Sequence, residues 1–155
     1  MEKLTFDLYI ITRLTQIYYT HELEKMGLSY GEFPFLISVY ENDGISQEGL
    51  SSLLMISKSS TAAMLQKLEG SGYVIREVNP EDRRNFCLHI TEAGRAFIPG
   101  IRQMIDSCHE KILEGMTASE KKKTLELIRR MKVQSEEIRI KKRDFRKKKQ
   151  KKRQE

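Results

Sequence analysis

Residues 45–94 read ISQEGLSSLLMISKSSTAAMLQKLEGSGYVIREVNPEDRRNFCLHITEAG, and they carry the signals of four short elements. Ser46 and Ser57 each precede a short run with apolar leucines and are predicted N-caps, because a serine oxygen accepts from the free amides of a first helical turn. Residues 73–78 and 86–90 are predicted strands, separated by a polar, turn-rich segment. Helix, turn, helix and hairpin within about fifty residues is the order of a winged helix-turn-helix module.

A long helix is predicted before this module. Residues 1–26 place apolar side chains with a period of about 3.6, and Gly27 is the predicted C′ residue. The apolar positions occupy more than one face, so the helix needs a second buried surface and we expect a dimer contact. Ser29 to Glu32 has the spacing of a capping box and predicts a second helix to about residue 42, with Pro34 past its first turn.

Long helices are also predicted after the module. Thr91 is the predicted cap of one helix that runs to about Glu114 and is kinked at Pro99-Gly100. Residues 117–120 read TASE, a second capping box, and predict a last amphipathic helix that continues into the C-terminal residues.

The positive charge of the chain lies at one end. The net charge is +6, yet residues 141–155 carry ten Lys or Arg and two acids, while the other 140 residues carry 18 bases and 20 acids. A basic run of this kind attracts polyanions without reading their sequence, or serves solubility alone. Both interpretations of the tail stay open at this point.

Several classes of protein are excluded by what the sequence lacks. Two cysteines without CxxC spacing, short apolar runs and no signal-peptide layout favour a soluble, cytoplasmic chain with no membrane contact. No HExxH, GxSxG, P-loop or GxGxxG pattern occurs, so we expect neither an enzyme nor a cofactor. Cys87 and His89 are interpreted as packed core, and the set of His21, Glu24, Cys108 and His109 is too incomplete for a metal site.

The wing segment has the most specific pattern in the chain. Residues 82–84 (DRR) followed by residues 88–94 (LHITEAG) match the wing signature D-x-R, then L-x-[LI]-T-x-x-G, of the MarR (multiple antibiotic resistance regulator) family. Supporting matches are Leu50, residues 57–59 (SKS), residues 65–69 (LQKLE) and residues 72–74 (GYV). Over roughly residues 4–135 the chain resembles this family of bacterial and archaeal transcription factors.

The resemblance implies a fold class that is mostly α (α+β), a winged helix-turn-helix with long N- and C-terminal dimerisation helices. It implies a single MarR-type domain over residues 1–140, in which 1–42 and 91–140 form the dimerisation helices and 45–90 form the winged module. Residues 141–155 would follow as a basic tail. The implied partners are a second copy of the chain, double-stranded DNA and a small-molecule effector.

The second helix of the module is the predicted reader of DNA, because a helix fits the major groove and presents polar side chains to base edges and phosphates. Its predicted contact residues are Ser57, Lys58, Ser59, Ser60, Gln66 and Lys67. Ala63 stands where the family often has arginine. We therefore expect specificity to rest more on Gln66, Lys67 and DNA shape.

The wing is the second predicted contact. By resemblance, Arg84 enters the minor groove and Asp82 holds the wing arginines in position. Arg83 and Arg76 are the expected phosphate contacts. Residues 45–95 contain six bases and six acids, so a positive face must come from how these charges are distributed. Three glutamates of the module, Glu48, Glu69 and Glu92, are expected away from the contact elements.

The leading hypothesis is a homodimeric, sequence-specific transcriptional repressor that binds inverted half-sites about 34 Å apart. In many relatives a small phenolic or other aromatic acid weakens DNA binding from a cleft. Here that cleft would involve residues that, taken singly, are more often plain core: Ile17, Tyr18, His21, Phe33, Phe35, Ile101 and Ile105. The rival hypothesis is a winged-helix interaction module that binds a protein, or RNA through its basic tail.

Overall fold

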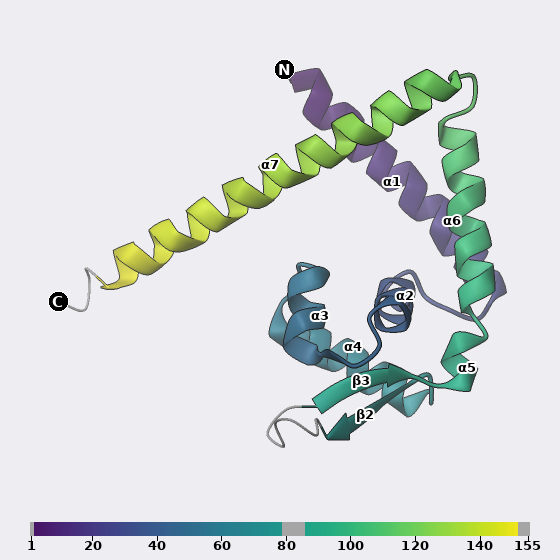
Figure 1. Ribbon diagram of the computed structural model, residues 1–155, viewed down its shortest axis with the longest axis vertical. Coiled ribbons are helices and arrows are strands. Elements are labelled where there is room, and N and C mark those ends of the chain that lie inside the picture. Colours follow the sequence, from purple (N-terminus) through teal and green to yellow (C-terminus); the bar gives the residue numbers. More distant parts are fainter. Residues whose placement is uncertain (1, 79–85, 152–155) are drawn as a thin grey trace. The chain divides into compact units, whose positions relative to one another are not determined.

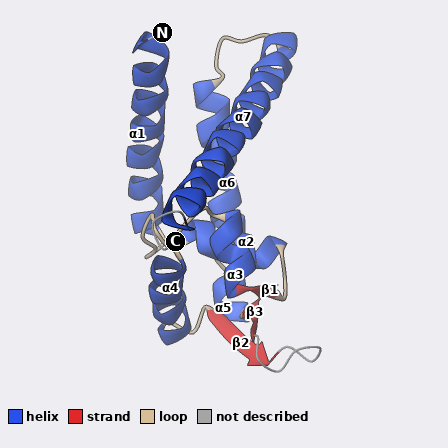
Figure 2. Ribbon diagram, turned by 90° about the vertical axis from the view of Figure 1, so that its left-hand side faces the viewer, coloured by secondary structure: helices blue, strands red, loops and turns tan. Residues whose placement is uncertain are grey.

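The structure, a computed structural model, describes residues 2–78 and 86–151, and the side chains of 3–78 and 86–138. The chain divides into two compact units, residues 1–110 and 111–155. The elements in chain order are α1 (Glu2–Lys25), α2 (Phe33–Glu41), β1 (Ile45–Ser46), α3 (Gln47–Leu53), α4 (Lys58–Gly70), β2 (Val74–Val78), β3 (Phe86–Ile90), α5 (Glu92–Arg95), α6 (Ile98–Ile112) and α7 (Ala118–Lys151). Figure 1 labels all of them except β1, which is labelled in Figure 2.

The predicted winged helix-turn-helix is confirmed in the first unit. Its three strands form an antiparallel sheet in the order β1-β3-β2, with Arg76 opposite Leu88 and Ile45 opposite Leu88 on the other side. Figure 2 shows these strands at the end of the unit opposite the start of α1, beside α3. The pairing of the central strand β3 with both neighbours ties the hairpin to the residues that begin α3.

Side-chain caps begin the helices of the module, as the sequence predicts. The Ser46 Oγ accepts from the Gly49 amide at 3.0 Å, and the Ser57 Oγ accepts from the Ser60 amide at 3.1 Å. Each cap satisfies an amide that has no partner within its own helix. Gly27 ends α1 with a φ of +74°, a conformation that glycine adopts without a steric penalty.

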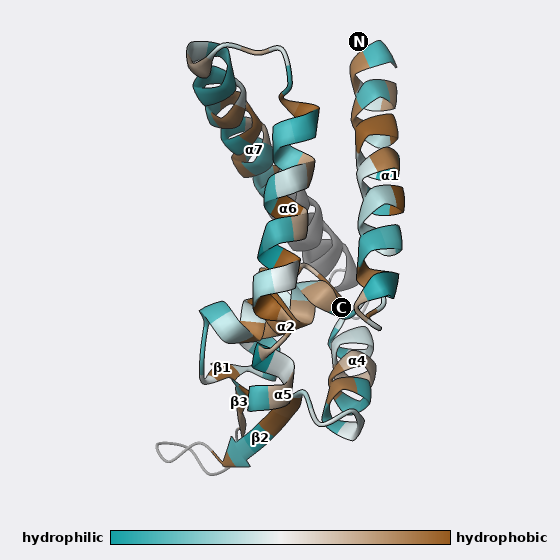
Figure 3. Ribbon diagram, turned by 90° about the vertical axis from the view of Figure 1, so that its right-hand side faces the viewer, coloured by the Kyte–Doolittle hydropathy of each residue, from teal (hydrophilic) through white to brown (hydrophobic). Residues whose placement is uncertain are grey.

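Leucines from α3, α4 and β3 form the centre of the core, joined by residues of α1, α2 and α6. Leu50, Leu65, Leu68 and Leu88 are fully buried, and the second half of α1 joins them through Leu23. The part of α1 up to Ile17 is different, and Figure 3 shows several hydrophobic segments along this helix. Seven of its large apolar side chains are exposed: Leu4, Phe6, Leu8, Tyr9, Ile11, Leu14 and Ile17. That face has no partner within the described part of the first unit.

Two expectations about helix boundaries are wrong. The helix predicted from residue 29 begins at Phe33, because the 29–32 capping box forms a turn, so Pro34 lies in the first turn where its missing amide costs nothing. The long helix predicted from Thr91 is two helices, α5 and α6, with the break at residues 96 and 97. Pro99 stands near the start of α6 and has no amide to donate to the Arg95 carbonyl, so the helical hydrogen bonds are interrupted there.

The interpretation of Cys87 and His89 as packed core is also wrong. Leu88 and Ile90 are the buried residues of β3, whereas Cys87 and His89 are half-buried on the opposite face. The His89 ring nitrogen Nδ1 lies 3.0 Å from the Asp43 carboxylate, so its polar group has a partner at the edge of the lobe.

The second unit is dominated by the 34-residue helix α7. Its predicted capping box is confirmed, since the Thr117 amide donates to Glu120 Oε2 at 2.8 Å and the Glu120 amide donates to Thr117 Oγ1 at 3.3 Å. The helix backbone continues to Lys151, so it includes residues 141–151 of the predicted basic tail. None of the helices in the described ranges combines the length and the apolar composition that a membrane span requires.

Candidate nucleic-acid interface

The N-terminus of α4 carries a cluster of serine hydroxyl groups. The Ser57 Oγ lies 3.0 Å from the Ser59 Oγ and 2.7 Å from the Ser60 Oγ, and all three residues are exposed. The cap leaves the first amides of α4 beside these hydroxyls. A helix N-terminus combines free N–H groups with the positive end of the helix dipole, so this cluster offers hydrogen bonds to an anion such as phosphate.

The rest of α4 separates cleanly into a buried and an exposed face. Thr61, Leu65 and Leu68 are fully buried, at the i, i+4 and i+7 positions that face a core. Gln66 and Lys67 are exposed. Ala63 is exposed too, so this position presents only a methyl group to the surroundings.

Lys58, at the start of α4, forms an ion pair with Glu48 of α3. Its Nζ lies 2.7 Å from Glu48 Oε1, and both side chains are 72% exposed. The hydrogen bond from Lys58, with its charge, lowers the pKa of Glu48. The expectation that Glu48 lies away from the contact elements is therefore wrong: the turn between α3 and α4 brings the two side chains together.

Lys67 forms a different kind of ion pair, with a buried carboxylate. Its Nζ lies 3.2 Å from Oε1 of Glu32, the residue before α2. Oε2 of Glu32 accepts from the Ser29 amide at 2.8 Å and from the Ser29 hydroxyl at 2.5 Å. Burial raises the pKa of Glu32, but the hydrogen bonds from Ser29 and Lys67 outweigh it and the net shift is downward.

Arg76 of β2 is the third predicted contact cation with a carboxylate partner. Its Nε lies 2.7 Å from Glu69 Oε1, with about a third of each side chain exposed. Glu69 is at the end of α4, so it also lies at the contact elements and not elsewhere. Each predicted contact cation that the structure describes, Lys58, Lys67 and Arg76, thus has a carboxylate within 3.2 Å.

The tip of the wing, with Asp82, Arg83 and Arg84, lies outside the described residues. The base of the wing is described, and hydrogen bonds hold it to the end of α4. The Thr91 hydroxyl donates to the Gly72 carbonyl at 2.7 Å, the Thr91 amide donates to the Tyr73 carbonyl at 3.0 Å, and the Gly94 amide donates to Thr91 Oγ1 at 3.1 Å. These bonds explain the threonine of the wing signature, whereas the glycine is explained by lack of space, since a Cβ on Gly94 would overlap the Tyr73 carbonyl oxygen.

The residues proposed for a ligand cleft are mainly core. Phe35 and Ile101 are buried, Tyr18, Phe33 and Ile105 pack against the core, and Ile17 and His21 are exposed. The Tyr19 ring meets Phe33 edge-on at 5.6 Å between centroids. Burial, together with the neighbouring Cys108 thiol, raises the pKa of Tyr19, so this hydroxyl stays neutral at physiological pH.

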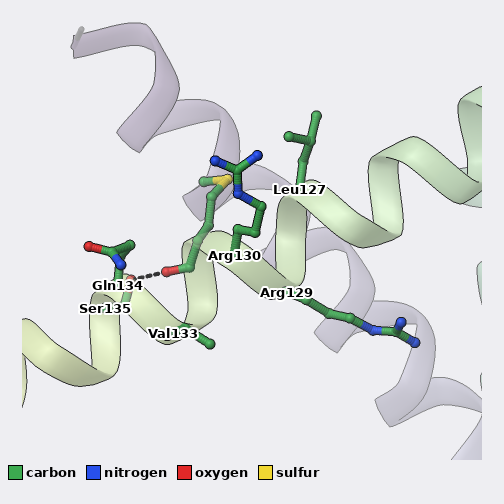
Figure 4. Close-up of a pocket in the computed structure, with 7 residues that line it drawn as sticks. Leu127, Arg129, Arg130, Val133, Gln134 and Ser135 are labelled. Carbon is green, nitrogen blue, oxygen red and sulfur yellow. Dashed lines mark hydrogen bonds between the residues drawn. The ribbon is translucent and has the colours of Figure 1, made fainter.

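No metal centre is found among the residues that the structure describes, since none of their histidine, cysteine and acidic side chains gather in groups of three or more. A pocket is present on α7, lined by Leu127, Arg129, Arg130, Met131, Val133, Gln134 and Ser135. In Figure 4 these side chains leave a single helix in different directions, and Ser135 Oγ donates to the Met131 carbonyl at 2.9 Å. A lining from one helix does not enclose a ligand.

Comparison with known proteins agrees with this geometry. The family model described as the MarR family matches residues 28–86. A MarR transcriptional regulator from Methanosarcina mazei has a similar structure, with 30% identity, a TM-score of 0.82, and coverage of 89% of this chain and 99% of that chain.

Two further relatives point the same way. A MarR family transcriptional regulator from Listeria monocytogenes, solved in complex with a 26-mer DNA, is 26% identical with a TM-score of 0.79 and coverage of 84% of this chain and 87% of that one. The HTH-type transcriptional regulator YybA of Bacillus subtilis is 28% identical over 110 residues, 71% of this chain and 73% of that protein. With its winged lobe and this similarity over nearly its whole length, the chain belongs to the MarR family of transcriptional regulators.

Proposed function

We propose that the protein is a homodimeric repressor that binds double-stranded DNA at inverted half-sites, with α4 of each copy in the major groove. The observation that carries this proposal is the division of α4 into a buried leucine face and an exposed polar face that begins at the capped serine cluster. A relative of the same fold has been solved with DNA, which supports the same class of partner.

The proposed contact residues fall into two groups. Gln66, Lys67 and Ser60 present donors and acceptors to base edges. The remaining residues bind phosphates: Ser57, Lys58, Ser59, Arg76 and Arg83. Arg84 reads the minor groove and Asp82 orients it. Phosphate contacts position the lobe, so sequence preference depends mainly on Gln66, Lys67 and the DNA shape that the wing meets in the minor groove.

A second copy of the chain is the proposed partner of α1. The seven exposed apolar side chains between Leu4 and Ile17 span more than three turns of this helix, and an apolar surface of that extent marks a protein interface. Two lobes joined in this way would meet inverted half-sites about one helical turn, ~34 Å, apart. Relief of repression by a small ligand would follow if the ligand bound one lobe spacing better than the other.

The decisive experiment measures binding of the full chain to its own upstream DNA by fluorescence anisotropy near physiological salt. Random duplex and single-stranded RNA of equal length are the competitors. We expect selective binding of one duplex by a dimer, and a loss of about tenfold in affinity on Gln66→Ala or Arg84→Ala. Matched substitutions at Gln103 and Arg102, both exposed on α6, are the controls for folding and charge.

The rival function is a winged-helix module that binds a protein or RNA. It is favoured by the carboxylate partners of Lys58, Lys67 and Arg76, which reduce the positive charge that these described residues offer to phosphate. Equal affinity for the operator, the random duplex and the RNA, abolished together by modest salt, would reject the repressor. Selective duplex binding by a monomer would reject only the dimer.

A further inference from the structure

The ion pairs at α4 differ in how easily a cation can leave. Lys58 and Glu48 are both mostly exposed, so water solvates each one when they separate. An exposed pair of this kind contributes little to stability, and its partners exchange readily. Lys58 is therefore a cation that is held near the serine cluster of α4 but is free to change its partner.

Lys67 is not interchangeable in the same way. Its partner Glu32 is buried, and when Lys67 leaves, only the two hydrogen bonds from Ser29 remain to compensate a buried negative charge. A buried charge that loses a partner is costly. Lys58 can therefore separate from Glu48 at little cost, whereas separation of Lys67 from the buried Glu32 is costly.

We propose that Glu48 sets the affinity for DNA by occupying Lys58 in the free protein, in competition with a DNA phosphate for the same ammonium group. This inference rests on the proposed function, since it assigns a regulatory role at the same surface. A phosphate replaces the carboxylate at Lys58 when the lobe docks, and Glu48 then stands as an uncompensated negative charge beside the DNA backbone.

The expected consequence is a weaker contact between Lys58 and a DNA phosphate. The charge of a lysine that is already paired adds less to counterion release than the charge of a free lysine, so both the affinity and its salt dependence fall. Screening limits the effect to short range, because the Debye length is about 8 Å at physiological salt. A carboxylate far from Lys58 should therefore not lower the affinity for DNA in this way.

The test is a double-mutant cycle on DNA binding with the full chain. Glu48→Gln, Lys58→Gln and the double variant are titrated against operator and random duplex at several salt concentrations. We expect Glu48→Gln to tighten binding to both duplexes by about fivefold. The slope of log affinity against log salt should steepen by about 0.9, the value for one phosphate contact. In the Lys58→Gln background the same substitution should change affinity by less than about twofold.

The control for net charge is Glu126→Gln on α7. Glu126 pairs with Lys123 at 3.0 Å and is about half exposed, so its environment resembles that of Glu48 without the link to α4. It should leave affinity unchanged. Thermal unfolding of each variant establishes that the lobe is folded, and Glu48→Asp, which keeps the charge on a shorter side chain, should give an intermediate affinity.

Two outcomes would overturn the inference. An equal gain from Glu48→Gln with and without Lys58 would mean general repulsion of DNA and not competition for the lysine, and an equal gain from Glu126→Gln would mean an effect of net charge alone. Failure of the proposed function is separate, because the unaltered protein would then show no preference for any duplex.

Discussion

Lys67 of α4 is bound to Glu32, the residue before α2, with 3.2 Å between Nζ and Oε1. The same Glu32 carboxylate accepts the two hydrogen bonds from Ser29 in the 29–32 capping box. One charged group therefore contacts both the turn before α2 and the exposed face of α4. The orientation of a proposed DNA contact therefore depends on a buried residue outside the winged module.

Glu32→Gln should lower the free energy of unfolding by about 1–2 kcal/mol at pH 7, because three charge-assisted hydrogen bonds weaken. The pKa of Glu32 lies below its ordinary value of 4.5 in the folded protein, so the charged form favours folding. That stabilisation is complete above the unfolded-state pKa and is lost as the pH falls through the folded value.

Denaturant unfolding at a series of pH values checks this. Below pH 4.5 the stability of the unaltered protein should fall more steeply than that of Glu32→Gln. Parallel curves for the two proteins would show that Glu32 titrates alike in the folded and unfolded chain.

Gly94→Ala should destabilise the lobe by about 3 kcal/mol, because the site has no room for a side chain. A Cβ at this position would overlap the carbonyl oxygen of Tyr73 and lie 2.9 Å from Ile90 Cγ1. The matched control is Gly70→Ala, at the end of α4, where a Cβ meets nothing within 4 Å. If both variants unfold at the same denaturant concentration, the close contact between Gly94 and the Tyr73 carbonyl is contradicted.

Thr61→Val should raise stability by about 1 kcal/mol. Thr61 is fully buried on the core face of α4, and among the described side chains its hydroxyl is the buried polar group without a hydrogen-bond partner. Valine has nearly the same shape and removes the unsatisfied oxygen. Thr61→Ser, which keeps the hydroxyl and loses the methyl group, should lower stability instead, and calorimetry distinguishes the two directions.

The winged lobe is predictable from the sequence because its signals are local. Ser46 and Ser57 each predict a helix start, because the serine caps an amide three residues later in the chain. The alternation of residues 86–90 predicts a strand. The capping box at Thr117 and Glu120 is read in the same way. The start of α2 is misplaced because the 29–32 capping box forms only a turn. The break before α6 is missed because Pro99 has no amide for the Arg95 carbonyl, an interruption that helical periodicity does not show.

The charge pairing of the site is not local, and no sequence spacing reveals it. Glu48 and Lys58 are ten residues apart on different helices, and Glu32 and Lys67 are 35 apart. Their contact depends on how α3, α4 and the turn before α2 pack. A census of charges correctly finds the module neutral, but only the folded arrangement places the acids on the cations.

The basic end of α7 should add affinity without adding selectivity. Removal of residues 141–155 takes away ten Lys or Arg and two acids, and each lost phosphate contact should reduce the slope of log affinity against log salt by about 0.9. Because these contacts ignore base sequence, the affinity for operator and for random duplex should fall by the same factor. Anisotropy titrations at four salt concentrations measure both quantities on the full and shortened chains. An unchanged slope would assign the basic residues to solubility, while a change in the ratio of the two affinities would mean that they help to read the operator.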